Sequence, residues 1–197
     1  MADAYVYAPV NGAIWSMDCY CNITYNCPCG TSNCGGGTPC SHCRFNGAAG
    51  NPMGSPIDVG GGSAGADLYF YTNGAVGSVY TQLDDFSSST CLSPLGQVVV
   101  VKLFAGVNAS GTFIGAVAYQ HVTDRVAAGS IFNGPGPNPN ALWGIRVGAM
   151  AASCGNGCCY NGVHSHMERD GGNTNSFYCN QQVSGGAGGT WIYHWGF

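Results

Sequence analysis

Cysteine is the feature that most constrains this chain, because twelve cysteines occur in 197 residues and seven of them fall between Cys19 and Cys43. The other five are Cys91, Cys154, Cys158, Cys159 and Cys179. Proteins in oxidising compartments keep cysteine at this density as disulfides. We therefore expect a secreted or cell-surface protein stapled by disulfides, and the sequence leaves their pairing open.

Zinc is the alternative use for these cysteines. The segment Cys40–Cys43 has the C-x-x-C spacing of a zinc knuckle, and Cys27-Pro28-Cys29 lies just upstream. A structural zinc site usually takes two such pairs separated by a loop of about a dozen residues or more. The pairs here are more crowded, so the spacing favours disulfides over metal.

Charge and composition exclude several classes of protein. Charged residues make up 7% of the chain, the net charge is -4, and five residues are Lys or Arg. Such a chain lacks the basic surface that nucleic acids or anionic membranes attract. Hydrophobic residues at 45% argue against disorder. No run approaches the roughly 18 apolar residues of a transmembrane helix.

Strand signals dominate the rest of the chain. β-Branched and aromatic runs bounded by Gly, Asn, Pro and Ser predict strands. These runs are Tyr5–Tyr7, Asp67–Thr72, Gln97–Phe104, Phe113–Val122, Gly144–Ala152 and Thr190–Phe197. No window has the 3.6-residue apolar period of a long helix. We predict a single all-β domain over residues 1–197, with antiparallel sheets and long Gly-rich loops. Residues 18 to about 66 are expected to be a disulfide-rich loop insertion.

Histidine is the best candidate for chemistry. If residues 163–169 form a strand, His164 and His166 project from one face, because side chains two apart share a side. Two imidazoles on one face suit a metal ligand with a neighbouring acid or base. His121 ends another predicted strand, with Tyr119 on the same face, and taken alone it is interpreted as structural. Glu168 is interpreted as a surface carboxylate at a strand end.

The order of short motifs around these histidines resembles that of LytM-type (M23, lysostaphin-like) zinc metallopeptidases. A Y-x-H strand at 119–121, a V-x-x-G turn at 126–129, a G-x-x-V-G turn at 144–148 and an H-x-H-x-E strand at 164–168 follow one another. The opening segment 6–14 also resembles the family's V-x-A-P-x-x-G strand and turn. Together these blocks cover about half of the chain.

The resemblance implies an activity and a role for each histidine. His166 would be a zinc ligand, and His164 and His121 would assist the attacking water and the tetrahedral intermediate. The implied reaction is hydrolysis of amide bonds in peptidoglycan cross-bridges or other Gly-rich peptides. Zinc would lower the pKa of its bound water to about 7.

The chain also departs from the family pattern. The family's other two ligands come from an H-x-x-x-D segment before the strand that matches residues 6–14, and here that segment would precede residue 1. Three explanations are open. The chain is truncated after those ligands, it is a non-catalytic homologue that binds cell wall or partner proteins, or His42, Asp58 or Asp67 replaces the ligands.

The aromatic residues of the last predicted strand are relevant to the hypothesis of a non-catalytic, wall-binding homologue. Alternation would place Trp191, Tyr193, Trp195 and Phe197 on one face, which indicates either a core-facing strand or an aromatic platform for glycan. Low charge, abundant Tyr and Gly, and dense cysteine also suit a third class, a self-assembling structural subunit.

Overall fold

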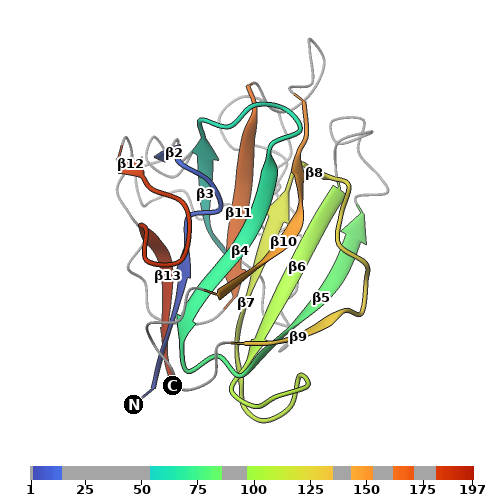
Figure 1. The fold of residues 1–197 in the computed structure, drawn as a ribbon, viewed down its shortest axis with the longest axis vertical. Helices are drawn as coiled ribbons and strands as arrows, with labels where there is room; N and C mark the ends of the chain where they lie inside the picture. Colours follow the sequence, from blue (N-terminus) through green and yellow to red (C-terminus); the bar gives the residue numbers. More distant parts are fainter. Residues whose placement is uncertain (1, 15–53, 86–96, 135–142, 153–161, 171–180) are drawn as a thin grey trace.

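The computed structural model describes residues 2–14, 54–85, 97–134, 143–152, 162–170 and 181–197 (Figure 1). Every regular element in these ranges is a β-strand, so the prediction of an all-β fold is confirmed. The strands are β1 (Asp3–Tyr7), β2 (Gly12–Ile14), β3 (Gly54–Gly60), β4 (Asp67–Gly74), β5 (Ser78–Asp85), β6 (Gln97–Phe104), β7 (Phe113–Gln120), β8 (Val122–Thr123), β9 (Ile131–Asn133), β10 (Trp143–Met150), β11 (His164–Asp170), β12 (Gln182–Val183) and β13 (Trp191–Gly196).

Several sequence predictions fall outside these ranges. All twelve cysteines lie outside the described residues, so the predicted disulfides lie outside them as well. His42 and residues 18–53 of the predicted insertion are also outside the described residues. Within the described ranges, no helix is long and apolar enough to cross a membrane.

Two antiparallel sheets lie face to face. The five-stranded sheet has the order β13-β1-β4-β10-β8, and the eight-stranded sheet has the order β12-β2-β3-β11-β7-β6-β5-β9. In Figure 1 the smaller sheet lies in front of the larger one. The two ends of the chain meet at the bottom of that view, where β1 pairs with β13 and Asp3 lies opposite Gly196.

The core fills the space between the sheets. Val6, Phe70 and Ile145 project into it from the smaller sheet, and Val99 and Met167 project from the larger one. Because alternate side chains of a strand share a face, each sheet turns one set inward. Each large apolar side chain that is fully buried contributes about 1.5–3 kcal/mol relative to one left in water.

The larger sheet is buried on its outer face as well. Val98, Val100, Ala116 and Ala118 form a second apolar cluster on that side of β6 and β7. Burial on both faces explains why β6 and β7 lack polar alternation in the sequence, since a continuous apolar run is consistent with a fully buried strand. This outer face also carries the candidate site.

The predicted loop insertion is wrong in its last part, because residues 54–60 form β3. β3 pairs with β2 on one side and with β11 on the other. Ile57 and Val59 face the core and are 2% and 0% exposed. Pro56 and the surrounding glycines are typical of turns, so from sequence this segment is interpreted as a loop although Ile57 and Val59 alternate like a strand.

The prediction that alternate aromatic residues of the last strand share one face is also wrong. Tyr193 and Trp195 are buried in the core, as the core-facing reading expected, but Ile192 is buried too. The register of β1 with β13 shifts between Val6 and Tyr7, whose partners are Tyr193 and Trp191. This β-bulge turns Trp191 to the outer face, because an extra residue in one strand breaks the alternation.

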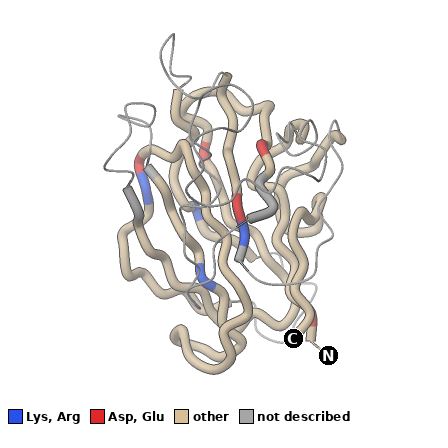
Figure 2. The backbone as a smooth tube through the Cα atoms, turned by 180° about the vertical axis from the view of Figure 1, so that it is seen from behind, with Lys and Arg blue, Asp and Glu red and all other residues tan. Residues whose placement is uncertain are grey.

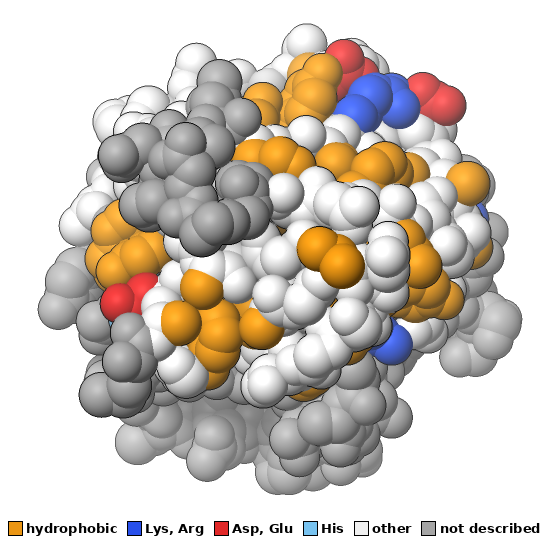
Figure 3. Space-filling view, turned by 60° about the horizontal axis from the view of Figure 1, so that its bottom comes forward, with side chains coloured by type: hydrophobic (Ala, Val, Ile, Leu, Met, Phe, Trp, Pro, Cys, Tyr) orange, Lys and Arg blue, Asp and Glu red, His pale blue; other side chains and the backbone are white. Residues whose placement is uncertain are grey.

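Charged residues are few and are scattered along the described backbone (Figure 2). On the lower side of the molecule, hydrophobic side chains form small groups separated by polar side chains and backbone (Figure 3). Among the described large hydrophobic residues, Val107 and Ile131 are the most exposed, at 57% and 48%. The surface of the fold is therefore largely neutral.

Candidate functional site

Strand β11 places the candidate site in the middle of the larger sheet, between β3 and β7. His164, His166 and Glu168 alternate with Ser165 and Met167, so the first three share the outer face of the sheet. The strand register sets Asp58 of β3 opposite His166, and Gln120 of β7 lies opposite His166 on the other side. A row of polar side chains thus crosses three strands.

His166 is the centre of this row. Its Nδ1 lies 2.5 Å from Asp58 Oδ1, and its Nε2 lies 3.2 Å from Glu168 Oε1. The amide of Gln120 donates to the same Glu168 oxygen at 2.8 Å. All four side chains are buried, and Glu168 is 0% exposed. Hydrogen bonds on both sides therefore fix the orientation of the imidazole ring.

His164 lies beside the same carboxylate. Its Nε2 is 3.8 Å from Asp58 Oδ1, and its Nδ1 is 3.2 Å from the carbonyl oxygen of Gly162. The ring of His121 meets that of His164 edge-on, with 4.9 Å between centroids, and its centroid lies 6.2 Å from that of His166. The three histidines predicted from the sequence are therefore brought together.

A break in the chain brings His121 to the site. Strand β7 ends at Gln120 rather than at Val122 as predicted, because His121 has a φ of 59°, in the left-handed region that ends a strand. Its carbonyl accepts a hydrogen bond from the amide of Ala151 at 2.8 Å. The prediction that Tyr119 and His121 share a face is wrong, since Tyr119 belongs to the core while His121 packs against His164.

Burial and charge oppose each other at these groups. Burial lowers the pKa of His166, but the charge and hydrogen bond of Asp58, with the hydrogen bond of Glu168, outweigh it and raise the pKa to about 10. Burial raises the pKa of Asp58, and the neighbouring histidines, His166 above all, bring it below the ordinary value. Burial lowers the pKa of His164 and is the largest influence on it. These shifts favour the protonated form of the buried His166 and the neutral form of His164 at pH 7.

The donor types fit zinc, which takes carboxylate oxygen and imidazole nitrogen. Asp58 and His166 offer one of each, and His164 adds a second imidazole. Among the described residues, however, no group of three or more His, Cys, Asp or Glu side chains is arranged to hold a metal ion. In this arrangement the Asp58 and His166 side chains hydrogen-bond to each other instead of converging on a third point.

The other residues named from the sequence have different places. Asp67 lies on the smaller sheet and pairs with Arg146 at 2.6 Å. Glu168 is not the surface carboxylate that the sequence suggested, since it is fully buried. The H-x-H-x-E alternation could have revealed it, because it puts Glu168 on the face of the two histidines. Gln120 was missed, and no sequence signal singles it out from the apolar run of β7.

Comparison of this chain with protein-family profiles, with curated proteins and with solved structures found no significant match. The resemblance to M23 metallopeptidases therefore rests on the motifs alone. Membership of that family is therefore a prediction from the sequence.

Proposed function

We propose that this chain is an M23-like zinc metallopeptidase that cleaves peptidoglycan cross-bridges or other Gly-rich peptides. One observation carries the proposal. His121, His164 and His166 are named by the motif order, and they gather around the carboxylate of Asp58, although His121 follows β7 while His164 and His166 lie on β11. Three imidazoles and a carboxylate at one buried point are the groups that such a hydrolase uses.

Each side chain has a defined task in this proposal. Asp58 and His166 would hold the zinc ion, which when bound supplies a Lewis acid and an acidified water. Glu168 orients the ring of His166 through its hydrogen bond, and the amide of Gln120 holds Glu168 in place by donating to the same oxygen. The neutral ring of His164 accepts a proton from the attacking water, and His121 packs against His164 and donates to the oxyanion that develops on the scissile carbonyl.

Asp58 would replace part of the ligand set that the family draws from its H-x-x-x-D segment. It is one of the three substitutes that the sequence offered, and it lies on the strand next to the H-x-H strand, with its carboxylate at the imidazole of His166. Catalytic zinc normally takes three protein ligands. Asp58 and His166 supply two of these, while His164, with its Nε2 at 3.8 Å from Asp58 Oδ1, keeps the role of proton acceptor.

We also propose that the protein works outside the cell, as the twelve cysteines favour. Counting free thiols in the unfolded, unreduced protein tests this proposal. A value near zero is expected for disulfides, whereas about twelve reactive thiols would contradict secretion in an oxidised form.

The test of function is a zinc assay combined with a cleavage assay on the full chain. We expect one zinc per chain by mass spectrometry after dialysis, and hydrolysis of a fluorogenic pentaglycine peptide that stops on chelation. His164→Ala should abolish cleavage while the fold persists in circular dichroism. His194→Ala is the matched control, because His194 lies on the other sheet beside Asp3. Equal cleavage by the wild type and by His164→Ala would contradict the proposal.

A non-catalytic homologue is the second candidate, and one observation favours it. Both ring nitrogens of His166 are engaged by carboxylates, which gives the imidazole a structural role as a buried cation. Such a protein would bind cell wall or assemble with copies of itself. It predicts no bound zinc, no cleavage, and binding to isolated cell walls that survives His164→Ala.

A further inference from the structure

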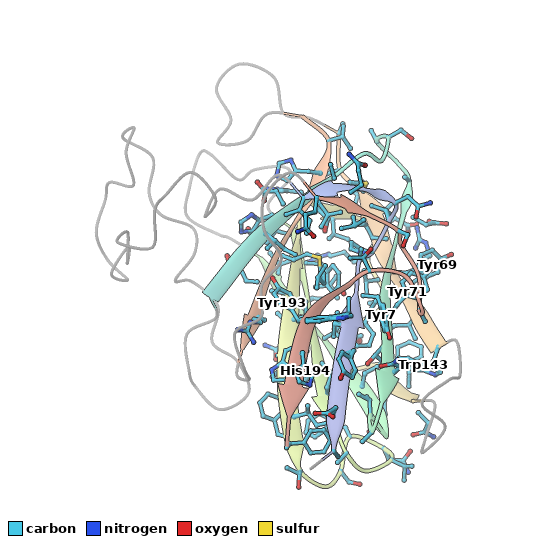
Figure 4. The ribbon with its side chains drawn as sticks, turned by 90° about the vertical axis from the view of Figure 1, so that its left-hand side faces the viewer. Tyr7, Tyr69, Tyr71, Trp143, Tyr193 and His194 are labelled. Atoms are coloured by element: carbon cyan, nitrogen blue, oxygen red, sulfur yellow. The ribbon has the colours of Figure 1, made fainter. Side chains whose placement is uncertain are left out.

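The outer face of the five-stranded sheet carries a second concentration of side chains, which we call the aromatic face. Figure 4 shows Tyr7, Tyr69, Tyr71 and His194 on the neighbouring strands β1, β4 and β13. The aromatic face comprises Tyr5, Tyr7, Tyr69, Tyr71, Asn73, Trp191 and His194. Most of these side chains are half-buried, so their rings are supported by the sheet but remain in contact with solvent.

One end of the aromatic face is a three-ring group. Tyr5 stacks on His194 with 4.6 Å between centroids and 18° between planes. Trp191 meets Tyr5 edge-on at 5.8 Å, since the bulge in β13 turns the indole outward. The three rings therefore support one another on β1 and β13.

The other end of the aromatic face is a platform. Tyr69 and Tyr71 are stacked with 5.3 Å between centroids and 20° between planes. Gly144 is the cross-strand partner of Tyr71, and a Cβ on Gly144 would lie 2.4 Å from Cδ1 of that ring. The Tyr71 ring thus occupies the space that a side chain at Gly144 would take.

Hydrogen-bonding groups lie between the two ends. Asn73 is the cross-strand partner of Tyr5, and its amide donates to the hydroxyl of Tyr7. The Oδ1 atom of Asn73 is buried and accepts no hydrogen bond from the described residues. An acceptor buried in this way is costly unless a ligand or water donates to it.

The charges around the aromatic face are balanced locally. His194 Nε2 lies 3.0 Å from Asp3 Oδ1 at one end. Arg146 lies between Asp67 and Asp124 at the other end, with both contacts at 2.6 Å. A strongly charged ligand would have to break these pairs, whereas a neutral ligand would not.

We propose that the aromatic face binds a neutral polysaccharide chain. A pyranose ring offers an apolar face that packs on aromatic rings and a rim of hydroxyls that reach amides and phenols, and Tyr and Trp combine both kinds of contact. From β13 to β4 the face spans two strand spacings of about 4.8 Å, or roughly 10 Å. This row is long enough for about two consecutive sugars. The site is separate from the histidine cluster, which lies on the other sheet.

The test is titration of the full chain with cellohexaose, followed by calorimetry and by tryptophan fluorescence. We expect saturable binding with a change in fluorescence, because Trp191 belongs to the face. Tyr71→Ala and Tyr5→Ala should each weaken binding by about two- to tenfold, the loss expected when one stacking ring is removed. Gly144→Ala should weaken it as well, since the new Cβ displaces the Tyr71 ring.

The control variant is Tyr80→Ala, which removes a half-buried tyrosine from β5 of the other sheet and should leave binding unchanged. His164→Ala should also leave it unchanged, so that failure of the peptidase proposal is distinguished from failure of this one. Absence of binding by the folded wild type would overturn the proposal. Sedimentation that shows association through this face, lost in Tyr71→Ala, would overturn it in favour of a second copy of the chain.

Discussion

The outer faces of the two sheets have the same strand geometry but differ in the burial of their side chains. On the larger sheet, Asp58, His166 and Glu168 are ionisable groups removed from water, and each satisfies another. On the smaller sheet, Tyr69 and Tyr71 are rings that keep contact with water and stack on each other. Both sets of side chains project outward from a sheet. The difference shows that a side chain needs a polar partner when it is buried, whatever its position on the strand.

This difference has an energetic consequence. A buried ion pair contributes little compared with an apolar replacement, but removal of one partner leaves a charge stranded at a cost of several kcal/mol. A half-exposed ring loses only part of its contacts when it is removed, and water takes its place. Substitutions on the two faces should therefore differ in size.

The largest effect is expected for Asp58→Asn. The substitution removes the charge that pairs with the buried imidazolium of His166, and the free energy of unfolding should fall by about 3–5 kcal/mol. Equilibrium unfolding in urea measures this change. Asp67→Asn is the matched control, because its carboxylate is half exposed and an exposed ion pair adds little. Similar urea midpoints for the two variants would contradict the comparison.

The second prediction concerns pH in protein treated with a chelator. The pKa of His166 is raised from 6.5 to about 10, so its contribution to stability is complete below pH 6.5 and is lost as pH rises toward 10. The pKa of Asp58 is lowered from 3.8, so its contribution is present above that value and is lost as pH falls through the folded pKa. Stability should therefore decline between pH 6.5 and 9.

Urea midpoints at a series of pH values measure this decline, which should amount to a few kcal/mol. Asp58→Asn should flatten it, because the pKa of His166 would then lie nearer its ordinary value. A wild-type midpoint that is constant from pH 6.5 to 9 would show that His166 is not a buried cation.

The sequence predicted those parts of the fold that local patterns determine. The runs that form β6 and β7 are rich in β-branched residues, and the H-x-H-x-E alternation puts His164, His166 and Glu168 on one face. Their burial could not be read locally, because it depends on which strands become neighbours. The same limit left Asp58 as one of three possible substitutes for the missing ligands, because it lies 108 residues from His166 in the chain and meets it only through strand register.

The positions of two other side chains depend on local backbone conformations that no sequence pattern predicts. His121 reaches the site because its φ is positive, which is uncommon for a residue other than glycine. Trp191 reaches the aromatic face because a bulge shifts the register of β13. Strict two-residue alternation fails at both positions, and both lie in or beside a candidate binding site.

A medium effect is expected for Gly144→Ala on the aromatic face. The new Cβ would crowd the Tyr71 ring, so the free energy of unfolding should fall by about 1–2 kcal/mol through overpacking. In the Gly144→Ala, Tyr71→Ala double variant the crowded ring is absent. We expect a coupling energy of at least about 0.5 kcal/mol between the two sites in a double-mutant cycle. Strict additivity would show that the ring does not lie over Gly144.

The smallest effect is expected for Tyr69→Phe. The substitution keeps the ring that stacks on Tyr71 and removes only a hydroxyl from a half-exposed position, so the free energy of unfolding should change by no more than about 0.5 kcal/mol. Affinity for cellohexaose should fall if that hydroxyl belongs to the polar rim of the face, while the thermal midpoint stays constant. Loss of stability as large as that of Asp58→Asn would mean that the aromatic face is part of the core, and the contrast between the two faces would fail.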